Sequence, residues 1–188
     1  MDNRISLEEY LSSYRTMAEK RKVFLAISKE MHRFHNDGKR ILRFHYRTIG
    51  VCFTNPTDIK FASYEKIGKA TMEEIMQMKF DNIQTLAIMA IGSFLDSYDY
   101  RLPLLSLDVL KENLDTLEHF FHPDDFIYFK RVLFLKEQLY YDDYIQQLEG
   151  DDVTVASSGN QAFTNYFLLI INLAVVLLLI GYILLLLS

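Results

Sequence analysis

Histidines in this chain are spaced so that two imidazoles could meet on one turn of a helix. The pairs are His32 with His35 and His119 with His122, and Asp124 or Asp125 lies near the second pair. Imidazole nitrogens and carboxylates bind Zn²⁺, but a zinc site needs three or four ligands held by organised surroundings. The spacing indicates no complete ligand set for either pair. Solvated or helix-capping histidines are therefore the favoured interpretation, and no metal or cofactor is expected.

Other reactive side chains also predict no catalytic site. The one cysteine, Cys52, lies in an apolar, strand-like run, where a buried small side chain is favoured over a nucleophile. A single cysteine cannot form an internal disulfide. The segment from Tyr140 to Tyr144 is a potential acidic phosphorylation cluster. A helix end with packed tyrosines and solvated aspartates is favoured instead. No nucleophile-elbow, zinc-protease or phosphate-loop motif occurs, so no small-molecule substrate is evident.

Charge is distributed unevenly along the chain. Residues 1–100 hold 15 Lys and Arg against 13 Asp and Glu, whereas residues 101–150 hold 5 against 10. The only basic concentration runs from Arg33 to Arg47. Such a run could face lipid phosphates or nucleic acid, but a solvated face or internal ion pairing is favoured. Nucleic acid is therefore not an expected partner.

The C-terminal residues predict a membrane anchor. Residues 167–187 carry no charge, and as a helix they would span about 31 Å, which matches the hydrocarbon core of a bilayer. Residues 1–30 contain no signal peptide. We therefore expect a cytosolic domain over 1–149, a linker over 150–166 and a tail anchor over 167–187. Asn172 could hydrogen-bond a partner helix, at about 1 kcal/mol, although a lone tolerated asparagine is favoured.

The long anchor has no Lys or Arg after it. This favours the endoplasmic reticulum, or a bacterial plasma membrane, over the mitochondrial outer membrane.

Capping signals and hydrophobic spacing predict the elements that would position these side chains. Ser6 with Glu9 and Thr71 with Glu74 form capping boxes, and the turn Asn55–Asp58 separates two short alternating runs. Continuous apolarity near 86–95 indicates a helix buried on most sides. The first expected elements are two consecutive helices, of which the first begins at 7 and the second ends near 36. A hairpin at 48–63, a helix at 71–95, and helices at 107–121 and 123–148 are expected to follow.

This order of elements resembles the C-terminal lobe of a protein kinase. In that lobe a helix beginning Ser-Leu precedes a long helix, a catalytic loop, a short hairpin and an Asp-Phe-Gly triplet. The corresponding segments here are Ser6–Leu11, His35–Gly38, Thr48–Val51 and Ile59–Glu65, and the buried helix containing Asp81 is similar to the central helix of the lobe. The resemblance covers roughly residues 6–148 and depends on spacing and apolar pattern.

The resemblance implies that the catalytic positions are degenerate. Arg43 occupies the position of the catalytic aspartate, Thr48 that of the metal-binding asparagine, and Ser63, Tyr64 and Glu65 that of the Asp-Phe-Gly triplet. An arginine stays protonated and repels Mg²⁺, so it cannot accept the proton of a substrate hydroxyl. No glycine-rich phosphate loop and no strand lysine precede Ser6. Kinase activity is therefore not expected.

The expected fold is mainly α: a kinase C-lobe-like helical domain with one short β-hairpin, followed by a single transmembrane helix. The expected function is a non-catalytic, membrane-anchored scaffold or regulator that binds partner proteins. One alternative is a tail-anchored helical regulator of the apoptosis type, although that family's tryptophan-containing motif is missing. The others are a structural subunit of a membrane complex and a vesicle-fusion helix.

Overall fold

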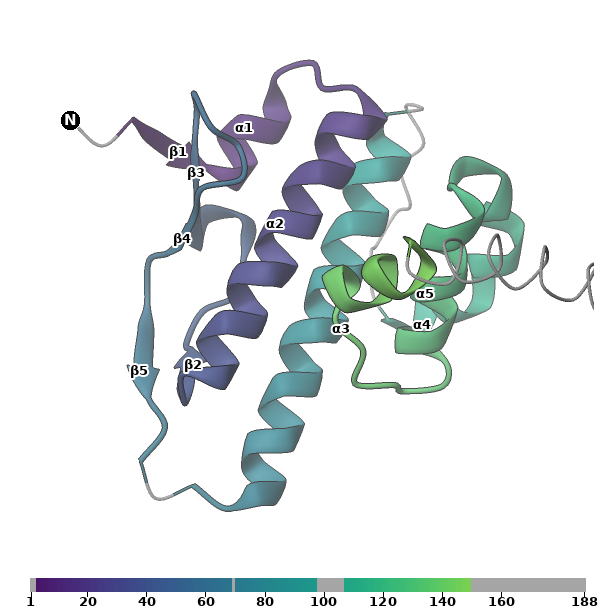
Figure 1. Ribbon diagram of the computed structural model, residues 1–188. Helices are drawn as coiled ribbons and strands as arrows, with labels where there is room; N and C mark the ends of the chain where they lie inside the picture. Colours follow the sequence, from purple (N-terminus) through teal and green to yellow (C-terminus); the bar gives the residue numbers. More distant parts are fainter. Residues whose placement is uncertain (1–2, 69, 98–106, 150–188) are drawn as a thin grey trace, which may run out of the picture. The chain divides into compact units, whose positions relative to one another are not determined.

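The computed structural model describes residues 3–68, 70–97 and 107–149 of the chain (Figure 1). The chain divides into two units, 1–145 and 146–188, and the elements below belong to the first. In chain order they are β1 (Arg4–Ser6), α1 (Leu7–Ser12), α2 (Met17–Asn36), β2 (Lys39–Ile41), the 3₁₀ helix η1 (Tyr46–Thr48), β3 (Ile49–Cys52), β4 (Ile59–Phe61), β5 (Tyr64–Lys66), α3 (Met72–Asp96), α4 (Leu107–Asn113), the 3₁₀ helix η2 (Leu114–Phe120) and α5 (Pro123–Leu133).

Side-chain caps determine where the helices begin. The box at the start of α3 is confirmed, because the Thr71 hydroxyl accepts from the Glu74 amide while the Glu74 carboxylate accepts from the Thr71 amide. Thr16 and Glu19 form an equivalent box that the sequence interpretation missed. Because this second box begins α2, the expected first helix ends early, at Ser12, and residues 14–16 are not helical.

Removing the cap of α3 should have a measurable cost. Thr71→Ala removes the acceptor for the Glu74 amide, so we expect the free energy of unfolding to fall by about 1 kcal/mol. Urea unfolding of the full chain in mild detergent measures this loss. Thr85→Ala is the matched control on the same helix, because the Thr85 hydroxyl only donates back to the Asp81 carbonyl. An equal loss in both variants would contradict a capping role.

The strands form two small antiparallel sheets, so the expectation of a single hairpin is wrong. The hairpin β3–β4 is present, with Val51 opposite Ile59, and β1 adds to its free edge through β3. The Arg4 Nη2 atom of β1 donates to both carboxylate oxygens of Asp58, at 2.8 and 2.7 Å, which attaches β1 to the hairpin turn. A second sheet pairs β2 with β5.

The core lies where α2 packs along α3, with β2 and β4 contacting α2 and α5 contacting α3 (Figure 1). Phe24 of α2 and Phe94 of α3 meet edge to face at 5.8 Å between ring centroids, and both are fully buried. Phe121 and Phe129 complete this aromatic cluster from the α5 side. Towards the strands, Phe34 of α2 meets Phe61 of β4, with ring centroids 5.2 Å apart.

The two expected C-terminal helices are both interrupted. Residues 107–121 divide into α4 and η2, and α5 ends at Leu133 instead of running to 148. Lys136 adopts a left-handed backbone conformation (φ 54°), which an α-helix cannot continue through. Residues 136–140 are non-helical, and a helix resumes at Tyr141. Because of this break, residues 140–143 can contact α2.

The expected fold also included a transmembrane helix, and none of the helices over 3–68, 70–97 and 107–149 combines the length and apolarity needed to cross a bilayer. The expected linker, 150–166, and the expected anchor, 167–187 with Asn172, lie outside the described residues.

Candidate functional site

The five positions implied by the kinase resemblance are brought together by backbone pairing. Pairing of β2 with β5 sets Tyr64 opposite Ile41 and Glu65 opposite Arg40. The Leu42 amide then donates to the Ser63 carbonyl at 3.1 Å. The loop between β2 and η1, which contains Arg43, is therefore adjacent to the connection between β4 and β5.

At three of these positions, the side chain makes contacts that stabilise the local fold. The Thr48 hydroxyl lies 2.5 Å from the Arg43 carbonyl and 2.9 Å from the His45 carbonyl, and it accepts from the His45 amide. Thr48 therefore closes the loop from Arg43 to η1. The Tyr64 ring meets Phe34 edge to face at 4.8 Å, and Glu65 forms an ion pair with Arg40.

The basic run from Arg33 to Arg47 is largely paired with acidic side chains of the same unit. The ion pairs are Arg33 with Glu30 (2.6 Å), Lys39 with Asp37 (3.0 Å), Arg40 with Glu65, and Arg47 with Glu8 (2.7 Å). The Arg47 guanidinium lowers the pKa of Glu8, which is the direction expected for a carboxylate beside a cation. The Arg43 side chain is exposed, and no ion pair to it occurs within the described residues. Internal pairing therefore accounts for most of the run.

A second polar site lies where residues 140–143 return to α2. The His32 Nδ1 atom is 3.6 Å from Asp142 Oδ2 and 3.5 Å from Asp143 Oδ1. The three donor atoms all lie within 4.8 Å of one another. We call His32, Asp142 and Asp143 the His32 cluster. The sequence interpretation missed the two carboxylates, because only the break after α5 brings them to α2.

His35 has a different role from His32. Its Nδ1 lies 2.7 Å from the Tyr140 hydroxyl, and its Nε2 lies 3.1 Å from the Asn82 side-chain nitrogen. Burial disfavours the charged imidazolium and, with Lys79 and His32 nearby, lowers the pKa of His35 from 6.5 to about 4. His35 is therefore a neutral, hydrogen-bonded core residue at neutral pH and no partner of His32 in binding a metal.

Next to the His32 cluster lies a buried ionic group. The Arg21 Nε atom donates to Asp125 at 3.0 Å and to the Tyr141 hydroxyl at 3.2 Å, and that hydroxyl donates a short hydrogen bond to Asp125. Ser28 connects this group to the cluster, because its hydroxyl donates to Asp142 at 2.7 Å and accepts from the Tyr141 amide at 2.9 Å. Polar contacts therefore join α2, α5 and residues 140–143.

The other candidates from the sequence have local roles. His122 caps α5 by accepting from the Asp124 amide, and His119 is exposed. Cys52 is only half-buried, and its thiol contacts the Thr54 hydroxyl at 3.4 Å. This hydrogen bond lowers the pKa of the Cys52 thiol. Tyr141 and Tyr144 are packed as expected, but Asp142 is buried and not solvated.

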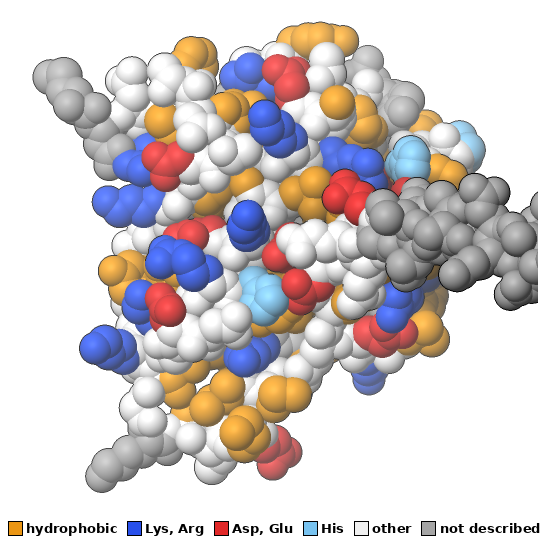
Figure 2. Space-filling model, in the orientation of Figure 1, with side chains coloured by type: hydrophobic (Ala, Val, Ile, Leu, Met, Phe, Trp, Pro, Cys, Tyr) orange, Lys and Arg blue, Asp and Glu red, His pale blue; other side chains and the backbone are white. Residues whose placement is uncertain are grey.

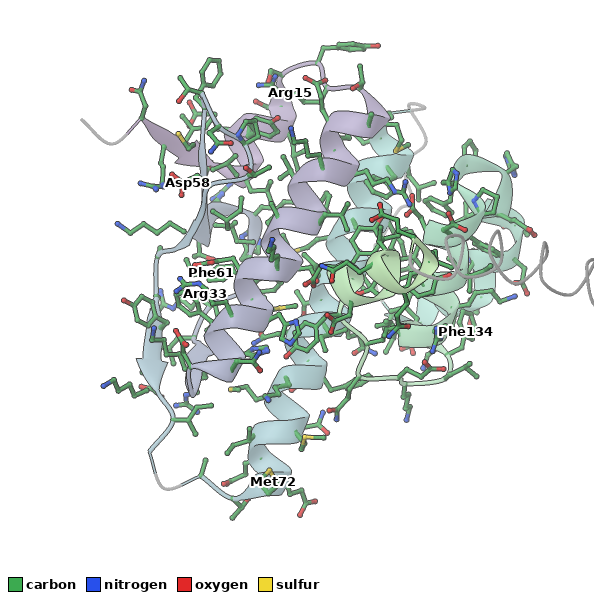
Figure 3. The ribbon with its side chains drawn as sticks, in the orientation of Figure 1. Arg15, Arg33, Asp58, Phe61, Met72 and Phe134 are labelled. Atoms are coloured by element: carbon green, nitrogen blue, oxygen red, sulfur yellow. The ribbon has the colours of Figure 1, made fainter. Side chains whose placement is uncertain are left out.

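The first turns of α3 expose apolar side chains. Met72 is 73% exposed and Met76 is 42% exposed, and we call these two residues the α3 methionine surface. Figure 3 labels Met72 at the start of α3, and Figure 2 shows hydrophobic side chains gathered over that end of the helix. A neighbouring pocket of about 490 Å³ is lined by Glu73, Glu74, Gln77, Met78, Asp81 and Asn82. Neither methionine lines this pocket, which lies farther round the helix.

Comparison of the chain with known protein families, with curated proteins and with solved structures finds no match.

Proposed function

We propose that this chain is a non-catalytic, pseudokinase-like scaffold that binds a partner protein at a membrane surface. The observation that carries the proposal is the α3 methionine surface, where two large apolar side chains at the start of a long helix are exposed to solvent. Methionine is flexible and polarisable, and it is common on surfaces that bind other helices or peptides. Adjoining apolar side chains that stay exposed could form part of an interaction site.

The degenerate positions support the non-catalytic part of the proposal. A guanidinium at Arg43 neither accepts a proton nor binds Mg²⁺. The Thr48 hydroxyl is engaged by the loop, and the Glu65 carboxylate by Arg40. None of these three side chains is therefore placed to hold a nucleotide's metal ion or to activate a hydroxyl group.

The exposed methionines also indicate the chemistry of the partner. Both side chains lie on one face of α3, because Met76 follows Met72 by four residues. A helical or extended segment that presents apolar side chains would complement the two methionines. Membrane attachment is proposed from the uncharged residues 167–187, with the endoplasmic reticulum favoured.

Co-purification tests this function directly. The full-length protein, with Met72→Glu and Met76→Glu combined, is isolated from its own membranes in mild detergent beside the unchanged chain. We expect a stoichiometric partner to fall by about tenfold, because two charges would be buried in an apolar contact. Tyr14→Glu is the matched control, because Tyr14 is 92% exposed and lies outside α3.

A partner kept by every variant would contradict this surface and favour the structural-subunit alternative. If nothing co-purifies with the unchanged chain, the scaffold function itself is wrong. The apoptosis-type alternative is disfavoured, because strands β1–β5 do not suit an all-helical fold.

A further inference from the structure

We propose that the His32 cluster binds a divalent transition-metal ion, for which Zn²⁺ is the best match. One imidazole nitrogen and two carboxylate oxygens form a ligand set of the kind that zinc accepts. The set joins α2 to residues 142 and 143, which are far from it in the sequence. The site is independent of the degenerate kinase positions and of the α3 methionine surface.

The distances fit ligands around a metal better than direct hydrogen bonds. An N–H···O hydrogen bond is about 2.7–3.2 Å long. The two separations from His32 Nδ1, 3.6 and 3.5 Å, are longer than that. Two ligands bound tetrahedrally at about 2.1 Å from a zinc ion lie about 3.4 Å apart. No hydrogen bond to either ring nitrogen of His32 occurs within the described part of the chain.

Neighbouring groups hold the ligands in position. The His32 ring stacks on Tyr140, with centroids 4.1 Å apart and planes inclined by 7°. The Ser28 hydroxyl donates to Asp142 Oδ1 at 2.7 Å, so the other oxygen, Oδ2, is the one nearest His32. Contacts of this kind orient metal ligands and strengthen binding. Asp142 is only 10% exposed and Asp143 is 38% exposed, so one side is open to water as a fourth ligand.

The charges also favour a cation. Two carboxylates face one imidazole, so acidic groups outnumber the basic one in the cluster. A divalent ion would offset both negative charges. The mixed nitrogen and oxygen ligands favour zinc over Mg²⁺ and Ca²⁺, which prefer oxygen alone. The bound ion would cross-link α2 to the chain segment that follows α5.

Zinc titration of the full-length protein tests the site. The protein is purified in mild detergent, stripped with EDTA, desalted and titrated with Zn²⁺ against a coloured chelator. We expect one tightly bound ion per chain, and an affinity at least about tenfold lower for His32→Gln and for Asp143→Asn. Asp143→Asn changes a partly exposed side chain, so the fold should be retained, and circular dichroism verifies this.

Asp124→Asn is the matched control, because Asp124 lies 3.1 Å from His122 in a pair that lacks a second carboxylate. This variant should bind zinc as the unchanged chain does, and Zn²⁺ should raise the Tm of both but not that of His32→Gln. The proposal is overturned if the unchanged chain binds Zn²⁺ no tighter than His32→Gln does. It is also overturned if Asp124→Asn weakens binding as much as Asp143→Asn. In either case the His32 cluster is an ion pair alone.

Discussion

Asp125→Ala is expected to lower the free energy of unfolding by about 3 kcal/mol or more, because removing one partner of a buried ion pair leaves the other charge uncompensated. Asp125 is 1% exposed and accepts hydrogen bonds from both Arg21 and Tyr141. Without it, the Arg21 guanidinium, which is 28% exposed, keeps only part of its hydration. The Tyr141 hydroxyl would also lose its acceptor within the core. Both losses act in the native state, so unfolding becomes easier.

Chemical unfolding of the full chain in mild detergent, followed by circular dichroism, measures this effect. The matched control is Asp115→Ala, since Asp115 pairs with Lys130 at a similar distance of 2.7 Å but is 78% exposed. Exposed ion pairs contribute at most about 1 kcal/mol. A loss as small for Asp125→Ala as for Asp115→Ala would mean that the buried group does not hold α2, α5 and residue 141 together.

Much of the local structure could be predicted from the sequence, because its signals are local. The Thr71 and Glu74 box lies within four residues, and the turn at Asn55–Asp58 separates the two strands that pair across it. The two sheets could not be predicted in the same way. Strands β1, β2 and β5 have only three residues each, which is too short for an alternating pattern. Their partners lie across α1, α2 or the hairpin, and no local signal specifies pairing at that distance.

The same limit applies to the candidate sites. His32 and His35 are equivalent by spacing, yet one faces two carboxylates and the other is buried against Tyr140 and Asn82. The difference comes from residues 140–143, whose position depends on the break at Lys136. Tyr141 and Tyr144 are three residues apart, and the expectation that they pack is confirmed. No local signal indicated that Asp142 between them would be buried beside Ser28.

The burial of His35 predicts a loss of stability in acid. The pKa of His35 is 6.5 when unperturbed and about 4 in the folded chain, so the unfolded state binds a proton over a range where the folded state does not. The stabilisation is therefore fully present above pH 6.5 and is lost as the pH falls towards 4. Between about pH 7.5 and about pH 5 we expect a loss of about 2 kcal/mol from this residue.

His35→Gln isolates this contribution, because glutamine still offers a donor and an acceptor to Tyr140 and Asn82 but does not titrate. Unfolding is measured at both pH values with EDTA present, so that metal binding at His32 does not contribute. Carboxylates that titrate over the same range act equally in both chains, and the difference in slope belongs to His35. His119→Gln changes an exposed histidine and should keep the slope of the unchanged chain. Equal slopes in all three chains would mean that His35 is hydrated and charges freely in the folded state.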